Sequence, residues 1–187
     1  MRWWTKFGRM ALALAAILSA SALPLRAQVR NSGASTITLQ AVLNDSMSVS
    51  LSGNAVSFNL TGGSASNPGS VGVTATTTWL LKPSVGSVSL YAFFASSSAA
   101  LTDGAGDNIP SADFQISDNA GPFTALTNTV PFGGANAGLM VSNTKILGNN
   151  KSGTRTDVLN FNINLSTLPN LPAGTYNGTL TIQAQAI

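Results

Sequence analysis

Three of the chain's six acidic residues lie in one glycine-rich stretch, LTDGAGDNIPSADF, at residues 101–114. The stretch contains Asp103, Asp107, Asn108 and Asp113. Carboxylate and amide oxygens are the ligands of Ca²⁺, which binds roughly six to eight of them. Their spacing fits neither the EF-hand loop nor the glycine-rich calcium repeat, and Asp and Asn also favour turns through bonds to nearby backbone. We therefore interpret the stretch as turns and keep a calcium site as the alternative.

The residue types that most enzyme mechanisms use are absent. The chain has no His, no Cys and no Glu. This composition excludes Ser-His-Asp and Cys-His catalysis, His-ligated zinc, and the Glu pairs of most glycosidases. Any catalysis would have to use Asp, Lys, Ser or Tyr alone. The sequence therefore predicts a protein that is not an enzyme and has no cofactor.

Two aromatic residues, Trp79 and Tyr91, are candidates for a sugar-binding platform. Trp79 lies on the apolar face of an alternating stretch, which predicts that its ring is part of the core. Tyr91 lies in a stretch that is apolar on both faces, so the sequence leaves its exposure open.

The first 27 residues have the layout of a secretory signal peptide. A positive stretch with Arg2, Lys6 and Arg9 precedes the apolar run of residues 10–18, and small residues follow up to Ala27. The run is too short to span a bilayer comfortably. We expect cleavage after Ala27, with cleavage after Ala22 as the alternative, and an exported protein without a membrane span after processing.

Residues 28–187 are unusually poor in charge. They carry five basic and six acidic residues, a net charge of −1, so the basic pI of the whole chain comes from the targeting segment. Nucleic-acid binding would need clustered Lys and Arg, and we expect none. The absence of Cys means that no disulfide supports the fold, which favours a bacterial envelope or extracellular protein with a sizeable core.

The remainder of the chain is patterned for β-strands. Apolar and β-branched residues alternate over 71–81 and 157–166, whereas residues 87–96 are apolar on both faces. The polar face of 157–166, with Asn160, Asn162 and Asn164, is expected to meet solvent. Shorter predicted strands are Val56 to Leu60, Phe114 to Ser117, Val130 to Phe132 and Leu139 to Val141.

Gly, Pro, Asn and Ser clusters separate these strands, and no stretch of residues 28–187 shows a convincing helical period. The pattern predicts one all-β domain, an antiparallel immunoglobulin-like β-sandwich of about nine strands. A closed barrel is the structural alternative, because periodicity alone does not separate the two.

Both ends of this domain alternate strictly. Near the start, Ile37, Leu39, Ala41 and Leu43 predict an edge strand, and residues 47–51 continue the same parity. The chain ends on LPAGTYNGTLTIQAQAI, in which Gly174, Tyr176 and Gly178 precede the alternating residues Leu180, Ile182 and Ala184. Tyr176 has two interpretations: a corner residue whose hydroxyl binds nearby backbone, or a contact with another subunit or chaperone.

Together these ends resemble the alpha-type fimbrial subunits that the chaperone/usher route assembles. Such subunits begin with an extended alternating strand and end with an Ala-Gly-x-Tyr-x-Gly pattern before the last strand. The residues that match are Ala173, Gly174, Tyr176 and Gly178 at the end, and Ile37, Leu39, Ala41 and Leu43 at the start. Only these terminal segments match, and Asp45 and Ser46 stand where such subunits carry Pro.

The leading hypothesis is therefore a non-catalytic fimbria-like subunit or matrix component of the bacterial surface. It would associate by β-strand addition, with the segment of Ile37 as donor and the strand of Ile182 as acceptor. The expected partners are further copies or neighbouring surface subunits, with a periplasmic chaperone in transit. The alternative hypothesis is a self-complete secreted module that binds carbohydrate or calcium through its loops. The sequence leaves open whether the strand is completed in cis or in trans.

Overall fold

The computed structural model describes residues 34–187, so the predicted signal peptide lies outside the described residues. The chain divides into a leading segment that ends at Ala41 and a body from Val42 to Ile187. Residues 34–41 have no regular secondary structure, and their side chains are exposed. The predicted edge strand over 37–43 was wrong, because no strand is formed before Ser46 in the described chain.

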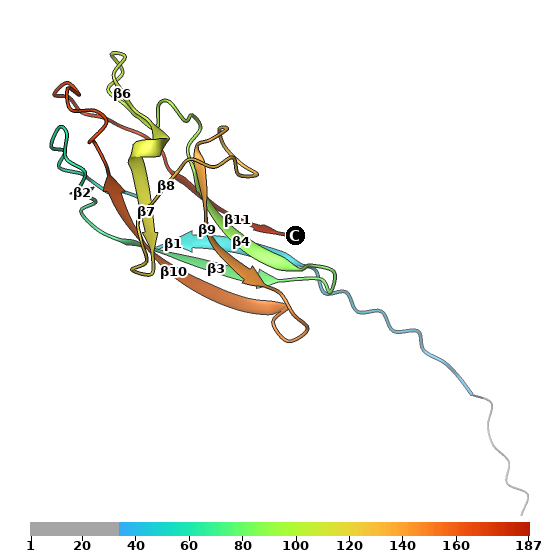
Figure 1. Cartoon of the computed structure of the whole chain (residues 1–187). Helices are drawn as coiled ribbons and strands as arrows, with labels where there is room; N and C mark the ends of the chain where they lie inside the picture. The colour runs from blue at the N-terminus through green and yellow to red at the C-terminus, as the bar shows by residue number, and fades with distance from the viewer. Residues whose placement is uncertain (1–33) are drawn as a thin grey trace, which may run out of the picture. The chain divides into compact units, whose positions relative to one another are not determined.

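The body is an antiparallel β-sandwich, as Figure 1 shows, and the predicted fold class is confirmed. Its longer strands are β1 (Ser46–Leu51), β3 (Val73–Leu80), β4 (Ser87–Phe93), β7 (Phe114–Asp118), β9 (Gly138–Lys145), β10 (Ser152–Ile163) and β11 (Thr181–Ala186). The two-residue strands are β2 (Asn67–Pro68), β5 (Leu101–Thr102), β6 (Asn108–Ile109) and β8 (Thr124–Ala125), and a 3-10 turn, η1, spans Ser111–Asp113.

The strands form two main layers. The larger sheet has the order β1-β3-β10-β7-β8, with β2 paired to one end of β10, and the smaller sheet has the order β11-β4-β9. The short strands β5 and β6 pair as a separate hairpin. β1 and β11 are therefore terminal strands of their sheets, and the sandwich is not closed between them.

The alternating pattern places side chains as expected in β3. Val73, Ala75, Thr77 and Trp79 are buried, while Thr74, Thr76 and Thr78 lie on the outer face. β4 is buried on both faces, as its sequence predicts, because it is the central strand of the smaller sheet. On its outer face the ring of Phe132 covers Tyr91 and Phe93, with ring centroids 6.0 and 5.8 Å away.

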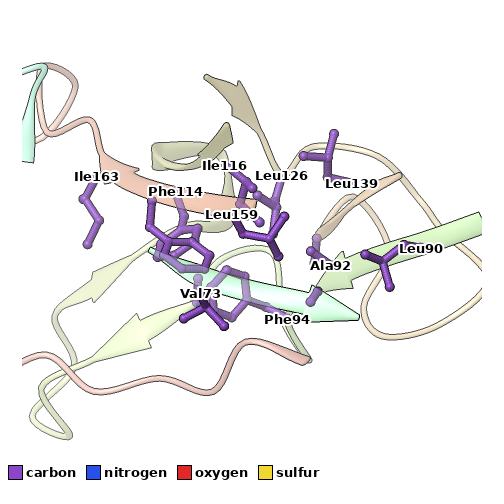
Figure 2. Close-up of a cluster of buried hydrophobic side chains, with 14 of the residues drawn as sticks. Val73, Leu90, Ala92, Phe94, Phe114, Ile116, Leu126, Leu139, Leu159 and Ile163 are labelled. Carbon is purple, nitrogen blue, oxygen red and sulfur yellow. The ribbon is translucent and has the colours of Figure 1, made fainter. Parts of the chain in front are cut away.

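The main core lies between the two sheets and is rich in aromatic rings. Figure 2 shows Val73, Phe94, Phe114 and Leu159, from four different segments, converging there. The Phe114 ring is at its centre, with the rings of Phe94, Phe58 and Phe161 at centroid distances of 5.1, 5.8 and 5.9 Å. A smaller, separate cluster contains Trp79, Val88 and Ile146.

Three details of the strand predictions were wrong. Residues 56–60 form no strand and contribute one isolated bridge, Phe58 to Gly69, and residues 130–132 lie in a loop. Asn162, expected in solvent, is only 5% exposed. Its side chain accepts from the Asn67 backbone at 2.8 Å and donates to Ala65 and Gln115, because the loop before β3 covers this end of β10.

A polar bridge links the two sheets away from β1 and β11. The fully buried Asp157 of β10 accepts from Arg155 Nε at 2.8 and 3.1 Å and from Ser142 Oγ, on β9, at 2.9 Å. Asn119 Nδ2 donates to the same carboxylate at 3.2 Å. The buried charge is thus paired and hydrogen-bonded, which is the condition for tolerating it in a core.

Candidate docking groove

The sandwich is open along one side, between β1 and β11. β1 is hydrogen-bonded only to β3, and β11 only to β4, so each has an edge without a ladder partner in the described part of the chain. The two strands run beside each other, with residues 47–49 facing residues 182–184 across a narrow gap. We call this opening the seam. Unpaired strand edges are the usual sites at which another strand adds to a sheet.

Beyond the end of β1 the seam widens into a groove of about 980 Å³. One wall is formed by residues 53–60, which follow β1, and the other by residues 171–182, which lead into β11. The core strands provide an apolar floor that includes Phe161, Ile163 and Phe114. The groove therefore exposes part of the inter-sheet core that a complete sandwich would cover.

The first wall lacks a strand for a local reason. Gly53, Asn54, Gly62 and Gly63 interrupt the sequence after β1, and such residues favour turns over strands. The apolar side chains of Val56, Phe58 and Leu60 nevertheless pack against the core from this side. The sequence predicted these residues as a strand and did not predict that they form a groove wall. The available signal was the alternation of apolar residues in a short segment between turn residues.

The second wall contains the C-terminal residues singled out in the sequence. Leu180 and Ile182 are partly buried and line the groove, while Ala184 is 8% exposed and lines the narrow part of the seam with Ile182. The structure thus brings all three to the opening. Their backbone belongs to the segment whose β11 edge lacks a partner.

Tyr176 stands at the rim of the groove and makes the contact of a tyrosine corner. Its hydroxyl donates to the Pro172 carbonyl oxygen, four residues upstream, at 2.9 Å. Desolvation raises the pKa of Tyr176, and the nearby Asp107 and Asp103 charges act in the same direction. Gly174 lies beside Asp103, and a Cβ at Gly178 would collide with the Ala100 carbonyl oxygen. The Gly-x-Tyr-x-Gly pattern therefore shapes the turn into the final strand.

The donor candidates are exposed. The exposed fractions of Ile37, Leu39 and Leu43 are 85, 88 and 80%, and Ala41 is also exposed. Large apolar side chains at such exposure, repeated at every second position, are typical of a surface that binds another molecule.

The acidic stretch forms a tight hairpin. Asp103 Oδ1 accepts from the backbone N–H groups of Ala105, Gly106 and Asp107 at 2.8, 3.1 and 3.0 Å. These bonds, the Ala105 one foremost, lower the pKa of Asp103. Asn108 donates to the Gly106 carbonyl, so it too stabilises the turn.

The proposed calcium ligands do not converge. Asp113 belongs to η1, and its carboxylate accepts from Thr167 Oγ1 at 3.1 and 3.0 Å. No group of three or more His, Cys, Asp or Glu residues with metal-binding geometry occurs within residues 34–187. The geometry therefore supports the turn interpretation of this stretch.

The two aromatic candidates for a sugar platform are buried. Trp79 is 5% and Tyr91 is 7% exposed, and Trp79 Nε1 donates to the Asn150 carbonyl at 2.9 Å. The prediction that Trp79 belongs to a core is confirmed. Neither ring offers a face on which a sugar would stack.

Comparison with known protein-family models, curated proteins and solved structures finds no match. In the part of the chain that the structure covers, no helix has the length and hydropathy to cross a membrane. Function is therefore inferred from the geometry of the body and from the exposed segment that precedes it.

Proposed function

We propose that this protein is a non-catalytic structural protein of the bacterial exterior, a fimbria-like subunit or matrix component, that associates by β-strand addition. The observation that carries the proposal is the apolar groove in the seam, flanked by the unpaired edges of β1 and β11. An inserted strand would part β1 from β11, bond to these edges through its backbone and place every second side chain over the core.

The exposed segment has the properties of such a strand. Ile37, Leu39, Ala41 and Leu43 share one face when the backbone is extended, and the other face carries Thr38 and Gln40. Seven residues in a strand span about 23 Å at roughly 3.3 Å per residue, slightly more than the six-residue β1 and β11. Insertion would remove these apolar side chains and the groove floor from water together, which favours association.

The uncharged surface supports an extracellular setting. Only 8% of the residues are charged, so few charges repel neighbouring copies or respond to pH and salt. Export itself follows from the predicted signal peptide. A periplasmic chaperone that covers the seam during transit fits the same geometry.

The test is the oligomeric state of the chain from Gln28 to Ile187, measured by size exclusion with light scattering over a range of concentrations. We expect concentration-dependent oligomers of the wild type. The variant Ile37→Asp/Leu39→Asp places charges on the face meant for the groove, and we expect it to remain monomeric. The matched control Thr36→Asp/Thr38→Asp adds the same charges to the opposite face, and we expect it to assemble.

A second measurement tests strand binding by the groove independently of the chain's own segment. A labelled peptide of residues 35–45 should bind the Ile37→Asp/Leu39→Asp chain, whose own segment no longer competes, and fluorescence anisotropy reports this binding. A wild type that is monomeric at every concentration, with a melting temperature lowered by the Asp pair, would indicate completion of the strand in cis. If the Ile37→Asp/Leu39→Asp variant assembles as the wild type does, the proposal is overturned.

A further inference from the structure

The lysines of the body gather at one end of the strands, and Asp103 and Asp107 lie at the other. The starts of β4 and β10 and the ends of β3 and β9 meet at one end, where Lys82, Lys145 and Lys151 gather. Lys151 Nζ donates to the carbonyls of Pro83 and Val85 at 2.8 and 2.7 Å. Lys82 forms an exposed ion pair with Asp45 at 3.2 Å. We call this region the lysine end.

The β5–β6 hairpin lies at the opposite end of the strands, as Figure 1 shows. It carries Asp103 and Asp107, and no Lys or Arg among residues 34–187 forms an ion pair with either of them. A bridge from Thr102 to Asn177 ties the hairpin to the rim of the groove, and Leu101 lines the groove itself. We call this region the aspartate end. The wide part of the groove is therefore bordered by acidic side chains.

We propose that the aspartate end of one copy contacts the lysine end of the next, so that charge sets the direction of assembly. This inference rests on the proposed strand addition. The chain enters β1 at the lysine end, because Asp45 contacts Lys82 there. Leu43 lies only two residues before Asp45, a span of about 7 Å. When Leu43 occupies the wide part of a neighbour's groove, its own lysine end lies near that neighbour's hairpin.

The direction of the inserted strand follows. With Leu43 at the aspartate end of the neighbour, the strand runs antiparallel to β11, and opposite charges meet. In the reverse direction Leu43 would lie at the neighbour's lysine end, and the two lysine ends would face each other. Asp45 offsets part of the positive charge at the lysine end, and Arg155 is engaged by Asp157 and Asp118. Exposed charges interact over about 8–10 Å at physiological salt, so the effect requires close approach and low ionic strength.

The test reverses the charges at each end while sparing the contacts that hold the fold. The variant Asp103→Asn/Asp107→Lys keeps an oxygen at position 103 for the hairpin N–H groups. The variant Lys82→Glu/Lys145→Glu changes exposed lysines and leaves Lys151 in place. The third chain carries all four substitutions. Thermal melts check that each variant folds, and light scattering follows the initial assembly rate of the chain from Gln28 at low and high salt.

We expect each two-residue variant to assemble about tenfold more slowly than the wild type at low salt. The four-residue variant restores opposite charges, so its rate should return close to that of the wild type. High salt should reduce all these differences. A rate unchanged in either two-residue variant, or no recovery in the four-residue variant, overturns the inference.

The labelled peptide of residues 35–45 separates this inference from the proposed function. It lacks a lysine end, so its binding to a groove does not involve the proposed charge contact between two copies. If the peptide binds and the chain assembles while reversed charges have no effect, the charge contact is wrong and strand addition stands. If neither peptide binding nor assembly occurs, the proposed function itself fails.

Discussion

At the scale of single residues, Gly178 has the tightest surroundings among the glycines of the groove wall. A Cβ at this position would collide with the Ala100 carbonyl oxygen and approach Leu101 Cγ at 3.1 Å. The obstacle is backbone, which cannot rotate away as a side chain does. The absence of a side chain at Gly178 thus lets the segment before β11 lie directly against residues 100–101, where the hairpin begins.

We expect Gly178→Ala to lower the free energy of unfolding by about 2–3 kcal/mol, the cost of forcing an extra carbon into a packed site. Urea unfolding followed by circular dichroism measures the change. Gly148→Ala is the matched control, since nothing lies within 4 Å of a Cβ at that position. Equal effects of the two substitutions would contradict the packing argument.

Asn162 provides a second test at this scale. Removing its side chain leaves the Asn67 N–H and the Ala65 carbonyl without these partners. We expect Asn162→Ala to cost about 1–3 kcal/mol, the penalty for buried polar groups that lose their hydrogen bonds. Asn160→Ala, two residues earlier on β10 and half-buried, should cost less. If chemical denaturation shows the reverse order, the loop does not depend on Asn162.

At the scale of elements, the link between β10 and β9 depends on one cation. Arg155 compensates the fully buried carboxylate of Asp157, whereas Lys82 and Asp45 pair at the surface with side chains 67 and 42% exposed. Removing one partner of a buried pair leaves an uncompensated charge, while an exposed pair contributes little.

We therefore expect Arg155→Met to lower the free energy of unfolding by about 3 kcal/mol. The double variant Arg155→Met/Asp157→Asn should recover most of this loss, because the buried charge is gone. Lys82→Ala should stay within about 0.5 kcal/mol of the wild type. A loss that the double variant does not recover would mean that Arg155 acts through packing.

Asp118, at the end of β7, gives stability a pH dependence. Desolvation raises its pKa, repulsion from Asp157 adds to this, and Arg155, at 3.9 Å, opposes it. The Asp118 carboxyl therefore holds its proton more tightly in the folded state than in the unfolded state, where its pKa is about 3.9. Stability from this group rises as pH falls through the folded pKa, and it levels off below about pH 4.

Asp118→Asn should consequently be more stable than the wild type at pH 7, and the difference should shrink on acidification towards pH 4. Thermal melts of both chains at several pH values measure it. Asp113, whose pKa is also raised by desolvation, is present in both chains and cancels in the comparison. A difference that is constant with pH would show that Asp118 does not titrate in this window.

The alternation of apolar and polar residues correctly predicted the strands that have a hydrogen-bonded strand on each side. β3, β4 and β10 were found from their own residues because each is paired on both sides, so local pattern and burial agree. Residues 37–43 have the same pattern but no ladder partner, and pattern without a partner does not produce a strand. The burial of Asn162 depends on a loop about 95 residues away, as does its bond to Asn67, and local periodicity contains no such information.

The groove was predictable in part for the same reason. The acceptor residues Leu180 and Ile182 followed from the alternating C-terminal stretch. The facing wall with Phe58 comes from more than 100 residues earlier, and only the order of the strands places the two walls opposite each other. The turn role of Asp103 followed from residue type, whereas the nearness of its hairpin to the groove did not.

At the scale of the whole molecule, the charged residues are too few to dominate stability. Their positions nevertheless distinguish one end of the strands, the lysine end, from the other, the aspartate end. The described chain has four basic and six acidic residues, and three of them form the buried or half-buried set of Arg155, Asp157 and Asp118. Most of the surface is neutral, with hydroxyl side chains along the outer face of β3 and β10. Association should therefore depend on the apolar seam, and its direction on the two charged ends.

The separation of the Trp79 cluster from the main core has an optical consequence. Trp79 is the only tryptophan in residues 28–187, and it reports on the lysine end through its contacts with Val88 and Ile146. Ala186, at the end of β11, packs against this cluster, so a 35–45 peptide inserted along the whole of β11 should shift the emission maximum of Trp79. An unchanged maximum on peptide binding would show that the peptide occupies only the wide part of the groove. Tryptophan emission thus reports whether an inserted strand extends from the groove to the lysine end.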